Sequence, residues 1–279
     1  MLYPLLALWL VATGGCLPTA AQPPNASHAS RRLRLATTTS VRDSGLLERL
    51  LPVFEKRHRC QVDVIAVGTG AALRLGAAGD ADALLVHAPA AEEAFLAAGH
   101  ASGRTPLMYN YFAILGPPHD PARIRGRPPV EALQRIAAGQ FRFLSRGDDS
   151  GTHQRELVLW QQAEGRPPWD AYLASGQGMG ATLVMADEMQ AYVLTDQGTY
   201  LNFQDHIDLV PLTPPSEALK NTYSVLTVSA GKHPAIPADL ARQLAQFLIS
   251  PEAQQRIENY RVAGQQLFWP QRPALRPEK

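Results

Sequence analysis

The sequence predicts an α/β protein of two lobes, each built on a mostly parallel sheet flanked by helices. Three observations lead to this class. Apolar extended runs alternate with segments whose apolar residues recur at helical spacing, which favours parallel strands joined by helices. Two long apolar segments, 108–118 and 221–230, bracket a middle block about as long as a small domain, as two strands crossing between lobes would. The amphipathic segment 237–260 should pack back on the first lobe.

Each element is predicted from its own pattern in chain order. Pro52 lies inside the first helical pattern and lacks an N–H, so it should kink or restart that helix. The nearly continuous apolar run 82–89 predicts a central strand covered on both faces. Gly165 should close the helix 152–165. The predicted strands are 32–36, 61–67, 82–89, 108–118, 141–145, 199–203 and 221–230, and the predicted helices are 46–54, 71–79, 129–139, 152–165, 180–196 and 237–260.

We expect lobe 1 to comprise residues 31–113 and 225–279, and lobe 2 to comprise residues 114–224. Residues 1–30 resemble a targeting segment and tether, because the apolar run from Leu2 to Val11 is too short to span a bilayer and is followed by small residues. The small residues before Cys16 resemble a bacterial lipobox, which would make Cys16 the lipidated first residue. Cleavage of the targeting segment within residues 18–22 is the alternative. The lipoprotein is favoured.

Composition excludes several function classes. With 46% hydrophobic and 18% charged residues, the 279-residue chain should fold as a soluble protein. A formal charge of +1 gives no broad electrostatic reason to bind nucleic acid or a membrane surface. If Cys16 is lipidated or removed, Cys60 is alone, so neither a disulfide nor a cysteine metal site is expected. We therefore expect a monomer without cofactor or metal, attached to a membrane only through a lipid at Cys16.

Polar loops between strands and helices carry the chemistry. Three such loops are Thr37–Ser40 (TTTS), Gly68–Gly70 (GTG) and Ser145–Thr152 (SRGDDSGT), and a fourth, Gly176–Thr182, precedes a helix without a clear strand before it. Any one of them alone is typical of ordinary helix capping. Together they predict an anion site, because ligands bind beyond the carboxyl ends of the strands, where helix N-termini and hydroxyls supply donors. Arg146 adds a guanidinium that can form two charge-assisted hydrogen bonds.

A hydrolase is the alternative from a different class, since Asp149, Ser150 and His153 have the residue types of a catalytic triad. Their adjacency argues against it, because triads are assembled from distant segments, and the G-x-S-x-G nucleophile motif is absent. The histidines show no metal-ligand spacing, and no Walker A motif occurs. We expect no enzyme.

The motifs ATTTS (36–40), VGTGAAL (67–73), SRGDDSGTH (145–153), GMGATLVMA (178–186), YLNF (200–203) and NTYSVLTVSA (221–230) have a specific likeness. From Leu33 to Trp269 the chain resembles the periplasmic tungstate-binding proteins of ABC importers, which have the type II solute-binding fold. The resemblance implies capture of tungstate or molybdate and delivery to a membrane permease. The ligand residues that it implies are Thr37, Thr38, Thr39 and Ser40, then Gly68 and Thr69, then Arg146 and Thr152.

The carboxylates of Asp148 and Asp149 bear on which oxyanion the site prefers. Tungstate and molybdate are fully deprotonated at neutral pH and only accept hydrogen bonds, whereas monohydrogen phosphate carries a proton and favours a site with an acceptor. Phosphate is the runner-up ligand, because phosphate-binding proteins have a similar Asp-x-Ser-Gly-Thr turn. We expect Asp148, Asp149, Ser150 and Gly151 to support the ligand-contacting residues from behind, with at least one of the two aspartates paired to Arg146.

Overall fold

A computed structural model describes residues 31–165 and 168–271 of the chain. The predicted targeting segment, with Cys16, lies outside these residues. Within the described part, no helix combines the length and the apolar character that a bilayer span needs.

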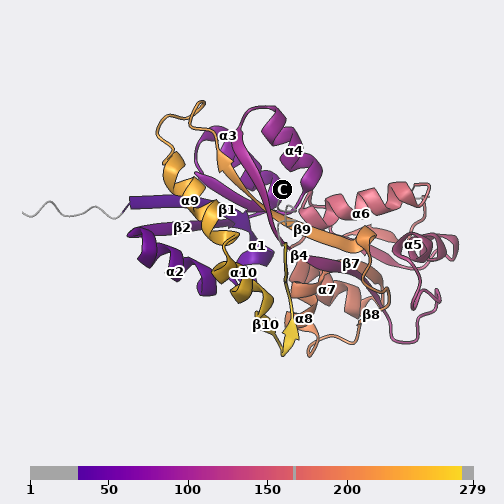
Figure 1. Cartoon of the computed structure of the whole chain (residues 1–279). Helices are drawn as coiled ribbons and strands as arrows, with labels where there is room; N and C mark the ends of the chain where they lie inside the picture. Colours follow the sequence, from indigo (N-terminus) through magenta and orange to yellow (C-terminus); the bar gives the residue numbers. More distant parts are fainter. Residues whose placement is uncertain (1–30, 166–167, 272–279) are drawn as a thin grey trace, which may run out of the picture. The chain divides into compact units, whose positions relative to one another are not determined.

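The described residues alternate between strands and helices (Figure 1). The strands are β1 (Arg31–Thr38), β2 (Cys60–Val67), β3 (Ala83–Val86), β4 (Ala101–Gly116), β5 (Phe143–Ser145), β6 (Tyr172–Ala174), β7 (Tyr192–Asp196), β8 (Val210–Pro211), β9 (Lys220–Val228), β10 (Arg261–Val262), β11 (Gln265–Gln266) and β12 (Trp269–Pro270). The helices are α1 (Thr39–Asp43), α2 (Leu47–His58), α3 (Thr69–Ala78), α4 (Pro89–Ala97), α5 (Pro129–Ala138), α6 (Gly151–Gln162), α7 (Met179–Glu188), α8 (Gln197–Phe203), α9 (Ala238–Leu248) and α10 (Pro251–Glu258), with a 3₁₀ turn η1 (Glu217–Leu219).

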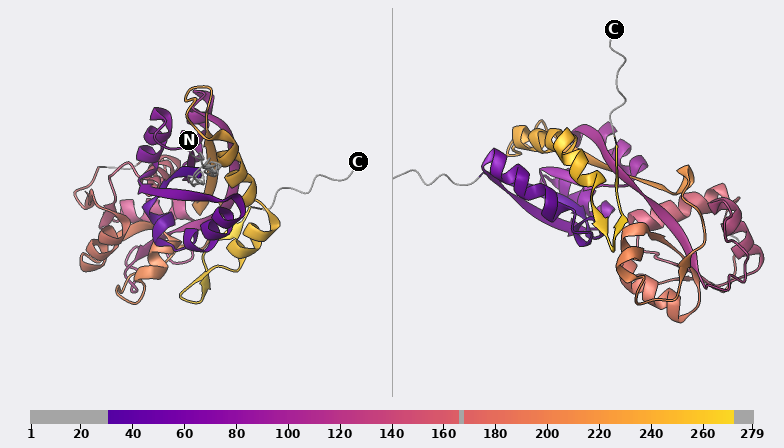
Figure 2. Two further views of the ribbon diagram at one scale, coloured as in Figure 1. Left: turned by 90° about the vertical axis from the view of Figure 1, so that its left-hand side faces the viewer. Right: turned by 60° about the horizontal axis from the view of Figure 1, so that its bottom comes forward.

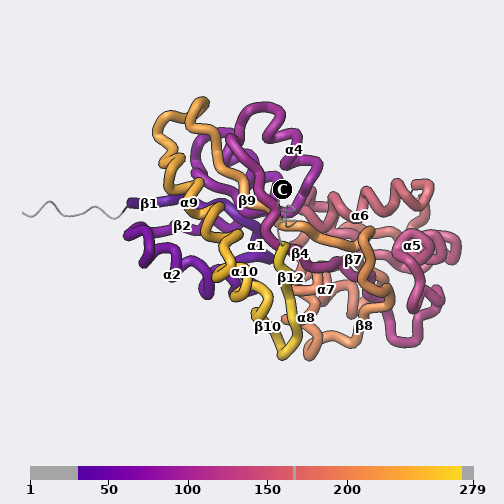
Figure 3. The backbone as a smooth tube through the Cα atoms, viewed as in Figure 1, coloured from indigo at the N-terminus to yellow at the C-terminus, as the bar shows by residue number. Residues whose placement is uncertain are grey.

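One sheet runs through both halves of this fold, in the order β2-β1-β3-β9-β4-β7-β5-β6. β1 pairs in parallel with β2 and β3, and β5 pairs in parallel with β6 and β7. The long strands β4 and β9 pair antiparallel to one another and join these two parallel sets (Figure 3). The fold class is therefore confirmed. The predicted lobe boundaries fall inside β4 and β9, and they stay a prediction.

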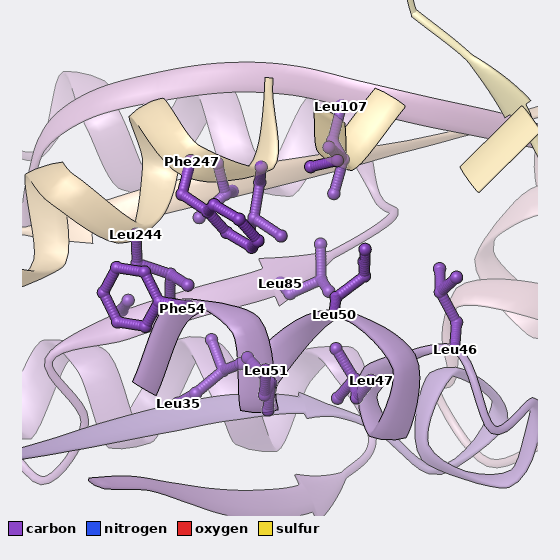
Figure 4. Packing of buried hydrophobic residues seen from close by; sticks show 14 of the residues in the cluster. Leu35, Leu46, Leu47, Leu50, Leu51, Phe54, Leu85, Leu107, Leu244 and Phe247 are labelled. Carbon is purple, nitrogen blue, oxygen red and sulfur yellow. The ribbon is translucent and has the colours of Figure 1, made fainter. Parts of the chain in front are cut away.

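Helices cover both faces of the β1–β3 half. Successive strand residues point to opposite faces of the sheet, so each face carries apolar side chains that a helix layer buries. Leu33 and Leu35 pack with α2, α9 and α10, while Ala36 and Leu84 pack with α3 and α4. Figure 4 shows side chains of α2 and α9 meeting over the sheet, and the rings of Phe54 and Phe247 lie 5.7 Å apart. The expected packing of segment 237–260 on this half is confirmed.

The β5–β7 half has the same layering, and Figure 2 shows it beside the first half. Phe143 packs with α5 and α6 on one face, while Leu144 packs with α7 on the other. The helix α8 contributes apolar side chains to the core of the other half. Leu201 of α8 lies in the core formed by β1, α2, α9 and Leu267, although its helix belongs to the middle block. The two halves thus share a small part of their cores.

Two sequence predictions were wrong. The helix predicted over 180–196 ends at Glu188, and the strand β7 follows a turn at Gln190, whose φ is +50°. All five residues of β7 are buried, so a strand between β4 and β5 covers them better than a helix with one exposed face. The predicted strand 199–203 lies in α8, because the Asp196 carboxylate accepts hydrogen bonds from the N–H and hydroxyl of Thr199 and starts a helix.

Smaller differences have local causes. α2 continues through Pro52 and does not restart there. Pro52 and Glu48 are both exposed, so water can satisfy the Glu48 carbonyl that a proline cannot bond. The strand β6 precedes the fourth polar loop, where none was expected, and α4 was not predicted at all.

A buried carboxyl stabilises the start of β6 against α6. Glu156 is 2% exposed, and its Oε1 accepts hydrogen bonds from the Tyr172 hydroxyl at 2.6 Å and from the Trp160 indole N–H at 3.2 Å. Burial raises the pKa of Glu156 above its ordinary value, and the hydrogen bonds only partly oppose that effect. The folded state therefore holds this proton more tightly than the unfolded chain does.

The pH dependence of the unfolding free energy should report the ionisation of the Glu156 carboxyl. Because its pKa is higher in the folded state, the protein should lose stability as the pH rises from the ordinary glutamate range through the raised pKa. Glu156→Gln keeps an acceptor for Tyr172 and Trp160 without the charge, so its unfolding free energy relative to wild type should increase with pH. Urea unfolding at about pH 5 and about pH 8 measures this difference. The exposed Glu93→Gln is the control, and an equal difference at both pH values for Glu156→Gln would contradict the prediction.

Candidate functional site

Three of the four polar loops meet around one small cavity. The volume of this cavity is about 20 Å³, little more than one water molecule requires. A cavity of this size is too small for a sugar, an amino acid or a peptide. Its lining comprises Thr38, Thr39, Ser40, Val67, Gly68, Thr69, His87, Arg146, Ser150, Gly151 and Thr152.

The loop after β1 contributes hydroxyls. Thr38 Oγ1 accepts the N–H of Val41 at 3.4 Å and lies 3.1 Å from Ser40 Oγ. Thr37 differs from the other members of the motif: it does not line the cavity, and its hydroxyl donates to the Leu85 carbonyl at 2.8 Å. The hydroxyl proton of Thr37 is therefore committed within the sheet, so the structure places this predicted ligand residue outside the cavity.

The loop after β2 begins α3 at the cavity wall. Gly68 is the N-cap of α3 and has no side chain, so the unpaired N–H groups of the first turn remain open to the cavity. Thr69 is only 3% exposed, and its hydroxyl has no hydrogen-bond partner within the described residues. A buried hydroxyl without a partner costs about 1–3 kcal/mol. Thr69 is therefore a donor that a bound oxygen could satisfy.

The loop after β5 begins α6 on the opposite side of the cavity. Ser150 Oγ accepts the N–H of His153 at 3.3 Å and so caps the helix, while Gly151 and Thr152 form its first turn. Ser150 does not bond to the His153 ring, whose Nδ1 accepts the backbone N–H of Asp149 at 3.0 Å. The three residue types of the hydrolase alternative are thus arranged as a helix cap rather than as a triad.

Arg146 reaches the cavity with its orientation fixed by neighbours outside it. Its Nη2 forms an ion pair with Asp148, and its Nε donates to the Gln177 carbonyl of the fourth loop at 3.3 Å. Asp148 also accepts the N–H of Ser150 at 3.2 Å, and Asp149 accepts from the Gln154 amide. The expected pairing of Arg146 with an aspartate is confirmed. Neither carboxylate lines the cavity.

The sequence reasoning missed His87. This residue follows β3, is 7% exposed and lines the cavity. Its Nδ1 lies 2.9 Å from Asn221 Oδ1, on the crossing strand β9. Burial lowers the pKa of His87 below its ordinary value, so that the ring is neutral in the ligand-free protein at neutral pH. The sequence holds one signal for His87. The predicted strand 82–89 should end at the same edge of the sheet as the strands that precede the TTTS and GTG loops.

A second cavity of about 300 Å³ shares His87 and Gly151 with the first and lies between α4, α6 and β9. Its walls include Ala88, Pro89, Phe112 and Val158, and its two cations, Arg155 and Lys220, make contacts of their own with a backbone carbonyl and with Glu217. This mostly apolar lining does not suit a small hydrated anion.

Comparison with known proteins agrees with this geometry. Residues 19–252 match the PBP superfamily domain. The tungstate-binding protein TupA of Peptoclostridium acidaminophilum is 44% identical over 249 residues, which cover 88% of this chain and 87% of that protein. This chain belongs to the TupA family of the PBP superfamily.

Solved structures of this family have the same fold. The tungstate-binding protein TupA from Desulfovibrio alaskensis G20 superposes with a TM-score of 0.80 at 42% identity, covering 88% of this chain and all of that one. The tungstate ABC transporter structure from Geobacter sulfurreducens has a TM-score of 0.76 at 46% identity, covering 82% of this chain and 98% of that one.

Two threonines of the TupA-family motifs should respond in opposite ways to the same substitution. Thr69→Val removes a buried hydroxyl that has no partner, so the ligand-free protein should be as stable as wild type or more stable. Thr37→Val removes the bond to the Leu85 carbonyl and should cost about 1 kcal/mol. Urea unfolding without oxyanion measures both variants, and a loss at Thr69 as large as that at Thr37 would contradict the assignment.

Proposed function

We propose that this protein captures tungstate, or molybdate, outside the cytoplasm and delivers it to the permease of an ABC transporter. One observation carries the proposal: hydroxyls, helix N-termini and a guanidinium line the cavity, and neither carboxylate of the SRGDDSGT loop is among its lining residues. The names of the TupA relatives support the same ligand.

The orientation of the carboxylates bears on the choice of oxyanion. A fully deprotonated dianion accepts hydrogen bonds at every oxygen, so a carboxylate in the wall would repel it. Asp148 instead fixes the fork of Arg146 from outside the cavity, and Asp149 bonds to α6. These contacts favour tungstate or molybdate over monohydrogen phosphate. The proposal assigns no catalytic step to any residue.

Capture would follow from closure about the crossing strands. The loops after β1 and β2 belong to one half of the fold, and Arg146 with Thr152 belongs to the other. A dianion would bind first to the hydroxyls and N–H groups of one half, and bending of β4 and β9 would then bring the other half onto it. Removing water from a dianion is costly, so donors from both halves are needed to compensate. A leader segment, and a lipid at Cys16, would keep the protein on the outer side of the membrane.

Titration with four oxyanions tests the function. Thermal stabilisation of the protein by tungstate, molybdate, sulfate and phosphate should be large for the first two and small for the others, because binding to the folded state raises the unfolding temperature. Phosphate in large excess should fail to displace tungstate. Displacement by phosphate would favour the phosphate alternative, and no stabilisation by any of the four would refute oxyanion capture.

Loss of the guanidinium should abolish most of the affinity. Arg146→Gln removes two charge-assisted hydrogen bonds of about 1.5–3 kcal/mol each, so tungstate affinity should fall at least about 100-fold. Calorimetry measures the change. Arg127→Gln is the control, because that side chain is exposed and lies outside the cavity. Near-normal tungstate affinity in Arg146→Gln would contradict the assignment of this residue.

A further inference from the structure

We propose that His87 contacts the bound oxyanion through Nε2 and takes up one proton when a fully deprotonated dianion binds. The inference deepens the proposed function and rests on it. His87 would then be a residue that determines specificity, because its proton decides which kind of oxyanion oxygen its Nε2 can face.

The hydrogen bonds of Asn221 fix the tautomer of His87. The Asn221 amide nitrogen donates to Asn110 Oδ1 at 2.8 Å and to the Tyr223 hydroxyl oxygen at 2.9 Å, so its Oδ1 is the atom that faces His87. An acceptor at this position requires a hydrogen on Nδ1 of His87. A neutral His87 therefore has a bare lone pair on Nε2.

Nε2 is the unbonded nitrogen of a ring that lines the oxyanion cavity, and the same ring also borders the second, apolar cavity. Nε2 makes no hydrogen bond within the described part of the chain, and it points away from Asn221, since the two ring nitrogens diverge. The ring lies against the first turn of α6: a Cβ added to Gly151 would be 2.7 Å from Cε1, 3.1 Å from Nδ1 and 3.3 Å from Nε2 of His87. Only glycine permits this contact. Gly151 and Thr152 line the same cavity, so an anion bound at this helix start would lie beside the His87 ring, whose one unbonded nitrogen is Nε2.

Every element packed against the ring affects its charge. From β4 and β9, the rings of Phe112 and Tyr223 lie 6.5 and 4.8 Å from it and bury it. Burial opposes the imidazolium most strongly, and Arg146, from the loop after β5, opposes it as well. Asp196, at the end of β7, and Asn221 favour the imidazolium but do not overcome burial. The ligand-free protein therefore holds His87 neutral at neutral pH.

A bound dianion changes this balance. The ion pair with Asp148 already offsets the positive charge of Arg146, so the cavity lacks a full compensating charge for a dianion. A proton taken from solvent onto Nε2 supplies one positive charge and converts the only bare acceptor of the His87 ring into a donor. Tungstate keeps its charge and gains a donor. Monohydrogen phosphate can instead donate its own proton to the neutral Nε2, without proton uptake by the protein.

The sign of the pH dependence follows. Binding raises the pKa of His87 relative to the free protein, so tungstate affinity should be highest below the pKa of the free state. It should fall as the pH rises through the pKa of the bound state, by up to about tenfold per pH unit for one proton. The advantage of tungstate over phosphate should shrink over the same range.

Calorimetry in two buffers with different ionisation enthalpies tests the inference, because their difference gives the number of protons taken up per tungstate bound. We expect about one proton for the wild-type protein near neutral pH. His87→Gln places a fixed N–H donor near Nε2, and His87→Asn keeps only the contact with Asn221, so both should bind tungstate with no proton uptake and no pH slope. His119→Gln is the control, because His119 is exposed and lies outside the cavity.

The outcomes separate the two proposals. Tungstate binding without proton uptake by the wild type, or with unchanged uptake in either folded His87 variant, would overturn the role of His87 and leave the proposed function intact. No tungstate binding by the wild type would overturn the proposed function itself. Circular dichroism identifies a variant that fails to fold, in which case the wild-type proton count and the other variant decide.

Discussion

The site depends on the direction in which its strands run. β3 and β9 are antiparallel, as are β9 and β4 and then β4 and β7, while β7 and β5 are parallel. β5 therefore runs opposite to β1, β2 and β3. The carboxyl ends of the two parallel sets face one another across the junction, and helices that start there direct their unpaired N–H groups into a common space. A sheet with all strands parallel could not surround a ligand from two sides in this way.

Within that arrangement, the polar side chains that hold the cavity lining in place are different from those that would contact the ligand. Asp148 orients Arg146 without lining the cavity itself, and Asn221 orients His87 from the crossing strand. Buried polar groups of this kind need fixed partners, because each unsatisfied group costs free energy. Among the described residues that line the cavity, Thr69 has a buried hydroxyl without such a partner, at a position where an oxyanion oxygen could bond to it.

The sequence predicted the parts of the site that local patterns encode. Three polar loops following strands were recognised from their hydroxyls and glycines, and Arg146 from its place after a strand. His87 was missed because a single histidine after an apolar run has no local pattern that distinguishes it from a core residue. Thr37 was placed in the site because its motif does not reveal that the strand alternation turns its hydroxyl toward Leu85. The boundary between α7 and β7 depends on burial between two neighbouring strands, which no spacing within 180–196 expresses.

Leu201 has a consequence for the motion of the molecule. Its side chain belongs to the buried cluster that contains residues of β1, α2 and α9 together with Leu267, while its own helix follows β7 of the other half. Separating the halves at this point would expose apolar surface to water, whereas separating the hydroxyl-lined walls would expose groups that water solvates well. The two halves should consequently separate at the polar loops and stay in contact at α8 when β4 and β9 bend.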